Sequence, residues 1–209
     1  MIAHSEPYSL PLFNSEKIIE KYGSIGVVAN FLEEIQATNA RFNLVSRETT
    51  YPDLIQMAAD SLIPFEFIEP PAGKIFDIGP GAGFPSLIIL LSFPGVEGVL
   101  FERTLKKAGF LAGIMRKFGL KGKIIPEDFL EAIKKIPSSE FNYGFMKYVR
   151  PDQRLLQGAQ SLLLPHGQFI YYSKFAPPSN NKTGLHKCRT HEYYLDNSDR
   201  VRTICVFSK

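Results

Sequence analysis

Cysteine is scarce in this sequence, with only two among 209 residues. Cys188 and Cys205 are too few for a disulfide framework or a four-cysteine zinc site, and the four histidines lack the spacing of metal ligands, so we expect no metal site. Long hydrophobic runs are also missing: the longest, residues 87–91, is far shorter than the roughly 18 apolar residues of a membrane span. The first residues do not resemble a secretory signal. We therefore expect a cytoplasmic protein with no membrane partner.

Positive charge is sparse in the first half of the chain and abundant in the second. Residues 1–100 hold 5 Lys and Arg against 12 Asp and Glu, a balance of −7, and residues 101–209 hold 19 against 9, a balance of +10, which gives the overall +3. A basic surface built from the second half suits a polyanion such as a nucleic acid. The alternative is that these side chains only decorate solvated helices. The 44% of hydrophobic residues suffices for the core of one ordinary domain.

The pattern of apolar residues changes near residue 74. Before it, residues 15–67 favour helices, because apolar side chains recur three and four apart, as in residues 28–35. After it, short apolar segments alternate with helical ones. The predicted strands are 74–78, 96–101, 123–125, 141–146, 168–173, 186–195 and 201–207, and the predicted helices between them are 85–92, 105–118, 129–136 and 154–164.

This alternation predicts an α/β fold with a mainly parallel, seven-stranded sheet and helices on both faces. The last two strands flank a turn and predict an antiparallel pair, and residues 177–184 predict a mobile loop. We therefore divide the chain into an N-terminal helical cap, residues 1–72, and a sheet domain, residues 73–209, packed as one unit.

A glycine-rich turn follows the first predicted strand, with Gly79, Gly81 and Gly83 shortly after Asp77. Glycine permits backbone conformations closed to other residues and lets a ligand approach the backbone. Between a strand and a helix, such a turn offers free N–H groups and the positive end of a helix dipole to a carboxylate or phosphate. Phe84 occupies the place of the last glycine in the dinucleotide-binding Gly-x-Gly-x-x-Gly motif. The turn alone is weak evidence for a nucleoside cofactor.

An acidic residue strengthens that interpretation. Glu102 ends the second predicted strand, 23 residues after Gly79, where a carboxylate in this topology accepts hydrogen bonds from both ribose hydroxyls. The alternative is a solvated strand end. Together with the turn, Glu102 predicts a nucleoside cofactor, and the missing glycine favours S-adenosylmethionine over NAD. Its methionine carboxylate would face the turn, with Asp77 near its cationic end.

Residues 77–85, Asp-Ile-Gly-Pro-Gly-Ala-Gly-Phe-Pro, carry a family resemblance. They resemble the Asp-(Val/Ile)-Gly-(Ser/Thr)-Gly-Ala-Gly-Phe-Pro-Gly signature of the bacterial small-subunit rRNA guanine-N7 methyltransferases, once called glucose-inhibited division protein B. Further segments resemble the family's Asn-Lys-x-x-Asn-Leu-Thr, His-x-x-Asp-Ser-Leu, Lys-(Arg/Lys)-x-x-Phe-Leu and acidic-acidic-Phe motifs, at residues 39–44, 60–62, 106–111 and 127–129. The resemblance implies a Rossmann-like class I S-adenosylmethionine-dependent fold and methylation of guanine N7 in small-subunit rRNA.

These observations lead us to expect a set of site residues. The expected cofactor-binding residues are Asp77, Gly79, Gly81, Gly83, Phe84, Glu102, Glu127, Asp128 and Lys147, of which Lys147 lies beside the methyl-transfer site and is also the expected catalytic residue. The expected RNA contacts are Lys106, Lys107, Tyr148, Arg150, Arg154, Lys174 and Arg202, with Lys121 and Lys123 as further candidates. For Tyr148 the alternative is core packing, and for any single lysine it is a solvated surface.

Four positions depart from the family pattern. Met57 replaces a histidine, Ser86 a glycine, Lys147 an arginine beside the cofactor, and Phe175 a glycine. Lysine keeps the charge of arginine but loses its planar fork, so a bidentate contact is lost. These departures leave open a non-catalytic RNA-binding relative.

The chemistry of the expected reaction needs few groups. Guanine N7 carries a lone pair and no proton, so positioning can supply catalysis without a general base. No (Asn/Asp)-Pro-Pro-aromatic motif of amine methylation follows the fourth predicted strand, and both cysteines lie in the last two strands. An NAD-dependent oxidoreductase and a small-molecule methyltransferase remain alternatives. We expect a monomer whose partner is ribosomal RNA or the small ribosomal subunit.

Overall fold

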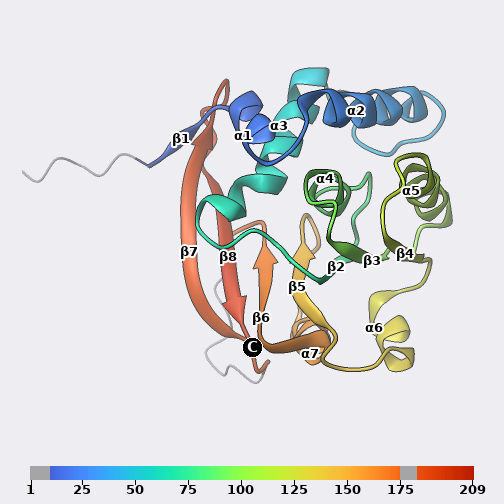
Figure 1. Cartoon of the computed structure of the whole chain (residues 1–209), viewed down its shortest axis with the longest axis vertical. Coiled ribbons are helices and arrows are strands. Elements are labelled where there is room, and N and C mark those ends of the chain that lie inside the picture. The colour runs from blue at the N-terminus through green and yellow to red at the C-terminus, as the bar shows by residue number, and fades with distance from the viewer. Residues whose placement is uncertain (1–9, 175–182) are drawn as a thin grey trace, which may run out of the picture.

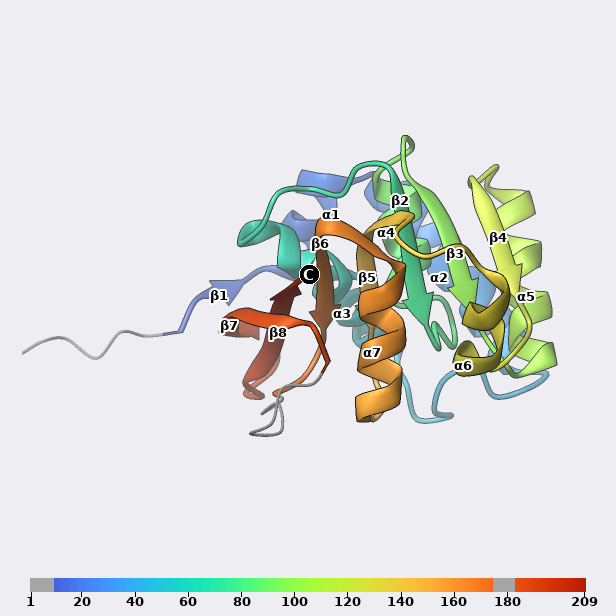
Figure 2. The ribbon, with the colours of Figure 1, turned by 90° about the horizontal axis from the view of Figure 1, so that it is seen from below.

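Eight strands make up one mixed sheet in the part of the chain that the computed structural model describes, residues 10–174 and 183–209. They are β1 (Leu12–Phe13), β2 (Lys74–Ile78), β3 (Glu97–Phe101), β4 (Gly122–Ile125), β5 (Phe141–Met146), β6 (Leu163–Tyr171), β7 (His186–Leu195) and β8 (Arg202–Ser208). From one edge to the other, their order is β1-β7-β8-β6-β5-β2-β3-β4, which can be followed in Figure 2.

The strands β2 to β6 pair in parallel, and β8 pairs antiparallel with both β6 and β7. The predicted parallel sheet and antiparallel C-terminal pair are confirmed. The prediction of seven strands was wrong by one, because β1, from the segment predicted as a helical cap, pairs in parallel with β7. Ile78, Phe101, Ile125 and Met146 are register partners at the carboxyl ends of β2 to β5. The residues that follow these strands therefore gather at one edge of the sheet.

Helices cover both faces of the sheet. They are α1 (Ser15–Tyr22), α2 (Ile25–Asn39), α3 (Tyr51–Leu62), α4 (Ser86–Ser92), α5 (Leu105–Lys117), α6 (Phe129–Ala132) and α7 (Gln153–Leu162), and 3-10 turns follow α3 and α6. Helices α1 to α5 lie on one side and α6 and α7 on the other (Figure 1). Alternate strand residues feed the two cores, because successive side chains point to opposite faces. Ile75 and Leu100 pack with the first set of helices, and Phe76 and Phe101 pack with the second.

The cap is less continuously helical than predicted. The loop of residues 40–50 separates α2 from α3, because Asn39 Oδ1 accepts hydrogen bonds from the N–H groups of Leu44 (2.8 Å) and Val45 (3.0 Å) and turns the chain. A capping box between Thr50 and Asp53 then starts α3. The hydrophobic core on this side contains residues of both the cap and the sheet, so the two parts pack together. The boundary at residue 72 stays a prediction.

The region around residue 165 also differs from the prediction. Helix α7 ends at Leu162, and β6 begins at Leu163 rather than at 168, running through the Pro-His-Gly segment that was expected to separate them. The extra residues fit because the register with β5 shifts there, from Phe141 opposite Leu163 to Tyr143 opposite Gln168. Most of the predicted mobile loop, 177–184, lies outside the described residues.

Candidate functional site

A cavity of about 680 Å³ opens at the edge where β2 to β5 end, and we call it the first cavity. Its wall comes from the turn after β2, the residues after β3, β4 and β5, the loop of residues 40–50 and helix α3. The volume is in the range of small-molecule and cofactor pockets. Seven of the nine predicted cofactor-binding residues line it, namely Gly79, Gly81, Phe84, Glu102, Glu127, Asp128 and Lys147.

The glycine-rich turn gives the first cavity its shape. Gly79 and Gly81 have φ values of +72° and +59°, a conformation that favours glycine. A Cβ on Gly79 would lie 2.8 Å from a methyl carbon of Val149, whereas a Cβ on Gly81 would meet nothing within 4 Å. Gly81 thus leaves room for a ligand to approach the backbone.

The expectation of free N–H groups in this turn was wrong for three amides. The Gly79 N–H donates to the carbonyl of Phe101 (2.9 Å), and the Gly83 N–H donates to a carbonyl within the turn (2.8 Å). The Gly81 N–H donates to Glu102 Oε2 (3.2 Å). Because the protein satisfies these donors itself, the turn supplies shape more than hydrogen bonds.

Glu102 lies at the end of β3, where the sequence predicted it, and is only 5% exposed. Its two oxygens accept hydrogen bonds from the N–H groups of Gly81 (3.2 Å) and Thr104 (2.8 Å), which fix the carboxylate against the cavity wall. Each carboxylate oxygen can accept two hydrogen bonds, so Glu102 keeps acceptor capacity for the hydroxyls of a ligand.

The two acidic residues after β4 also line the first cavity, but both have partners in the protein. Asp128 caps α6 by accepting a hydrogen bond from the N–H of Leu130 (2.9 Å). Glu127 forms an ion pair with Lys135 (2.7 Å). Both carboxylates line the cavity together with Glu102.

Asp77 and Gly83 are the two predicted cofactor residues that do not line the cavity. A Cβ on Gly83 would clash with Leu87 at 2.7 Å, so this glycine serves packing. Asp77 is fully buried; its Oδ2 accepts from the Ser86 N–H (3.3 Å), and its Oδ1 has no hydrogen-bond partner among the described residues. Burial raises the pKa of Asp77 to about 7, although contacts with Ser86 and the charge of Lys147 oppose the shift.

Lys147, the predicted catalytic residue, belongs to a buried polar cluster. Its side chain is 1% exposed, and Nζ lies 2.6 Å from Asp60 Oδ2. Arg202 approaches Asp60 Oδ1 at 3.6 Å, and Tyr193 donates its hydroxyl to the same oxygen at 2.5 Å. Arg202 also donates to Gln56 Oε1 (2.8 Å). The cluster joins helix α3 to β7, β8 and the end of β5.

The charge state of this cluster follows from its contacts. Burial acts to raise the pKa of Asp60, but the charges of Lys147 and Arg202 outweigh it and hold the pKa below its ordinary value. Burial and the nearby Asp60 charge raise the pKa of Tyr193 well above its usual range. Asp60 is therefore an ionised acceptor, and Tyr193 is a neutral donor.

A second cavity of about 320 Å³ adjoins the first, and its wall also includes Lys147 and Tyr148. Lys147 Nζ lies 5.5 Å from the ring centre of Tyr148 and 5.1 Å from that of Tyr172. Tyr148 is 69% exposed and has φ +59°, so the core-packing alternative for it was wrong. The second cavity is lined by Asp60, Lys147, Tyr148, Tyr172, Ser173, Lys174, Glu192, Arg200, Val201, Arg202 and Thr203.

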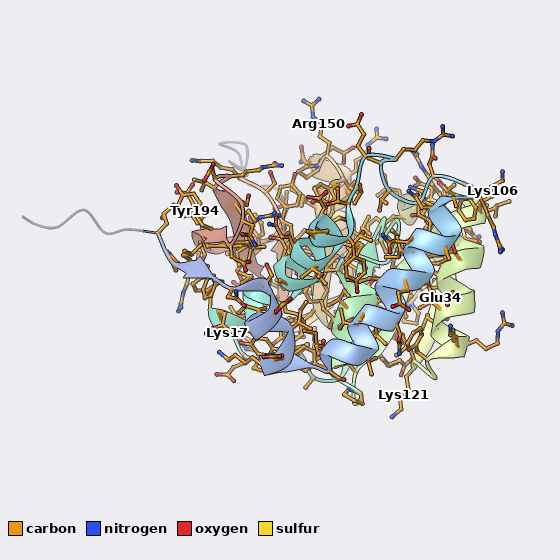
Figure 3. The ribbon with its side chains drawn as sticks, turned by 90° about the horizontal axis from the view of Figure 1, so that it is seen from above. Lys17, Glu34, Lys106, Lys121, Arg150 and Tyr194 are labelled. Carbon is orange, nitrogen blue, oxygen red and sulfur yellow. The ribbon has the colours of Figure 1, made fainter. Side chains whose placement is uncertain are left out.

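The predicted RNA contacts fall into three groups. Lys107 and Tyr148 line the first cavity; Tyr148, Lys174 and Arg202 line the second; and Lys106, Arg150 and Arg154 are exposed outside both. Arg202 is mostly engaged with Asp60, and Lys174 pairs with Glu192 at 3.2 Å. Lys106 and Arg150 point outward from one side of the molecule, and Lys121 points from the opposite side (Figure 3). Lys123 is exposed in β4. Contact with RNA stays a prediction for each.

Sequence reasoning missed the part of the site that comes from the cap. Leu44, Val45, Ser46 and Thr49 of the loop line the first cavity with Met57. The signals were the resemblance at residues 39–44 and the noted departure at position 57, but neither places a residue at the sheet edge. The role of Asp60 was missed as well, although residues 60–62 resembled a family motif.

Within residues 10–174 and 183–209, no three potential metal-ligating side chains come together. In the same residues, no helix combines the length and apolar character that crossing a bilayer requires. Phe175 lies outside the described part of the chain. Cys205 is buried, and its Sγ lies 3.6 Å from the hydroxyl of Thr190.

Residues 25–195 match the protein family GidB, rRNA small subunit methyltransferase G. A protein of that name from Syntrophomonas wolfei is 37% identical over 118 residues, which are 56% of this chain and 54% of the relative. Another from Campylobacter hominis is 30% identical over 149 residues, 70% of this chain and 76% of the relative. The chain thus spans little more than half the length of some of the curated relatives that it matches.

Solved structures resemble the fold. A SAM-dependent methyltransferase from Aquifex aeolicus has a TM-score of 0.59 at 13% identity, over 75% of this chain and 93% of that one. The mitomycin 7-O-methyltransferase MmcR has a TM-score of 0.58 at 18% identity, over 93% of this chain and 66% of that one. At such identities the likeness concerns the fold alone, which is that of class I methyltransferases. The family match over residues 25–195 shows that the chain belongs to the rRNA small subunit methyltransferase G family.

Proposed function

We propose that this protein uses S-adenosylmethionine to methylate guanine N7 in the RNA of the small ribosomal subunit. One observation carries the proposal: the first cavity lies at the carboxyl edge of the parallel strands, and Gly81, Glu102 and Lys147 all line it. In parallel α/β sheets, ligands bind at this edge. The family membership supplies the substrate class.

The residues present fit S-adenosylmethionine. The volume of about 680 Å³ admits a nucleoside with an amino-acid tail, and Gly81 leaves the wall open to it. Glu102 would accept hydrogen bonds from the ribose hydroxyls, and Glu127 or Asp128 would lie near the adenine. Asp77 is no direct contact in this arrangement: it supports the turn from behind, next to Ser86.

Bound S-adenosylmethionine supplies an electrophilic methyl group, which the N7 lone pair takes as the sulfur–carbon bond breaks. No residue has to remove a proton, because guanine N7 carries none, so the protein contributes position. Lys147 lines both cavities and is held in place by Asp60, so it would lie beside both reactants. Tyr148 offers an exposed ring on which a base can stack.

Three alternatives predict different results. An NAD-dependent oxidoreductase would bind NADH but not S-adenosylhomocysteine; the antiparallel β8 between β6 and β7 and the Phe84 side chain at the turn favour the methyltransferase. A non-catalytic relative would bind S-adenosylhomocysteine but leave RNA unmodified. A small-molecule methyltransferase would be indifferent to loss of Lys106 and Lys107.

The proposal is tested by comparing rRNA from the host with and without this protein by mass spectrometry. We expect one methyl group on one guanine of small-subunit rRNA to vanish when the protein is removed and to return with the wild-type chain. The purified protein, with naked rRNA and with assembled subunits, identifies the substrate form. Unchanged rRNA would contradict the proposal. Sedimentation and fractionation check whether it acts as a cytoplasmic monomer, as we further propose.

A further inference from the structure

The two cavities lie next to each other and have a common wall. Lys147 and Tyr148 line both of them. Methyl transfer requires the reacting atoms to come within about 3–3.5 Å of each other. If the first cavity holds the methyl donor, as the proposed function requires, a group in the second cavity lies next to it, with Lys147 and Tyr148 where the two cavities adjoin.

The charges in the second cavity favour an anion. Asp60 is shared between Lys147 and Arg202, and Glu192 pairs with Lys174. Arg200 lines the same cavity, is exposed, and makes no ion pair with any described residue. The second cavity is thus lined by four cationic side chains and only two carboxylates. A guanidinium without a partner at the mouth of such a cavity is well suited to a phosphate group.

Apolar surface accompanies these charges. Tyr148 is 69% exposed and Val201 is 40% exposed, and both line the second cavity. Tyr148 keeps its exposed position with a positive φ, a conformation that is uncommon for a bulky residue and often marks functional sites. An aromatic ring beside a cationic side chain such as Arg200 is the combination that binds a base together with its phosphate.

We infer that the second cavity is the subsite for the nucleotide that accepts the methyl group, with Arg200 and Lys174 contacting its phosphate and Tyr148 contacting its base. The inference rests on the proposed function and adds to it the place of the acceptor and a phosphate-binding residue, Arg200. The base would then enter the first cavity beside Lys147 and Tyr148, where the two cavities adjoin.

The first test uses single nucleotides, so that it does not depend on turnover. With the protein saturated by S-adenosylhomocysteine, guanosine 5′-monophosphate and guanosine are titrated by NMR. We expect the monophosphate to bind the wild type about tenfold more tightly than guanosine, and Arg200→Ala to lose that preference. Arg200→Lys should retain most of it. The matched control is Arg116→Ala, which changes an exposed arginine in the last turn of α5 and should behave like the wild type.

The second test uses RNA and separates an acceptor site from a site for free nucleotides. We expect Arg200→Ala to raise the KM for small-subunit RNA about tenfold with kcat nearly unchanged, and to leave the affinity for S-adenosylhomocysteine unaltered. Equal KM values for Arg200→Ala and Arg116→Ala would overturn the inference, as would equal binding of the monophosphate and guanosine. If the wild type binds the monophosphate through Arg200 but never methylates RNA, the proposed function fails, and the acceptor role fails with it.

Discussion

The Glu102 carboxylate accepts hydrogen bonds from the backbone, and it also lines the first cavity. The N–H groups of Gly81 and Thr104 hold it in place before any ligand arrives. A carboxylate that is pre-oriented in this way loses little entropy when it accepts ribose hydroxyls. We therefore expect the affinity for the ligand to depend on the charge of the Glu102 carboxylate as well as on its position.

We predict that Glu102→Gln weakens binding of S-adenosylhomocysteine by about 10- to 100-fold, because hydrogen bonds to a charged group contribute about 1.5–3 kcal/mol. Isothermal titration calorimetry measures the change. Glu97→Gln, at the exposed opposite end of β3, is the control and should leave affinity unchanged. Equal affinity of both variants would refute the role of Glu102.

Asp77 makes stability depend on pH. Its pKa of about 7 lies above the ordinary value of 3.8, so between these values the folded chain holds a proton that the unfolded chain has released. The free energy of unfolding therefore falls as pH rises from about 4 to 7 and levels off above that. Over this pH range the free energy of unfolding falls by about 4 kcal/mol, at roughly 1.36 kcal/mol per pKa unit.

Asp77→Asn removes this ionisation, and we predict that the variant gains stability relative to the wild type on going from pH 5 to pH 8. Urea unfolding at the two pH values measures the difference. Asp199→Asn, at an exposed position, should follow the wild type. Parallel pH curves for Asp77→Asn and the wild type would show that the Asp77 carboxyl titrates normally.

At the scale of elements, the pairing of β3 with β4 depends on a glycine, Gly122, at the start of β4. Gly122 has φ +129°, and a Cβ there would lie 1.9 Å from the carbonyl oxygen of Gly98, its partner in the ladder. Since both atoms belong to the backbone of paired strands, a side chain at Gly122 would force β4 away.

We predict that Gly122→Ala lowers the free energy of unfolding by about 3 kcal/mol or more. Because β4 leads to Glu127 and Asp128, cofactor affinity should fall with it. Gly109→Ala, in the exposed middle of α5 with no atom near its Cβ, should instead stabilise the protein by about 1 kcal/mol. Urea unfolding compares the two, and an unaffected Gly122→Ala would disprove the close contact.

Elements with strong periodic patterns were predictable from the sequence, and elements set by distant contacts were not. Glu102, Glu127 and Lys147 could be placed at one site because the carboxyl ends of parallel strands share an edge. Asp77 could not be placed correctly, since only the structure shows that its carboxylate faces α4 rather than the cavity. The loop of residues 40–50 reaches the site through packing of the cap, which no local pattern encodes.

The buried polar cluster around Asp60 and Lys147 could not be predicted either, because it depends on contacts between residues far apart in the sequence. Asp60 and Arg202 lie 142 positions apart in the chain, and their contact depends on β8 being inside the sheet. Arg202 was expected to contact RNA, whereas its guanidinium contacts Asp60 and Gln56.

At the scale of the whole molecule, the basic side chains of the second half of the chain lie on different sides of the surface. Lys106 and Arg150 extend from the side where the strands end, and Lys121 extends from the opposite side (Figure 3). RNA that reaches the two cavities would contact Lys106 and Arg150 but not Lys121. The contribution of each lysine to binding should therefore depend on its side.

We predict that RNA affinity falls linearly with the logarithm of salt concentration and that Lys106→Ala lowers the slope by about 1. Lys121→Ala is the matched control and should leave the slope unchanged. Filter binding over a range of KCl concentrations provides the measurement. The same loss of slope in both variants would mean that RNA does not prefer one side.

The position of β8 between β6 and β7 has a consequence for synthesis of the protein. Of the last three strands, the middle one in space is the final one to leave the ribosome. Until β8 is in place, β7 can pair only with β1 among the described strands and is not joined to β6, and Asp60 lacks Arg202, one of its two cations. A chain that stops before β8 would therefore leave the edges of β6 and β7 open to pairing with strands of other chains.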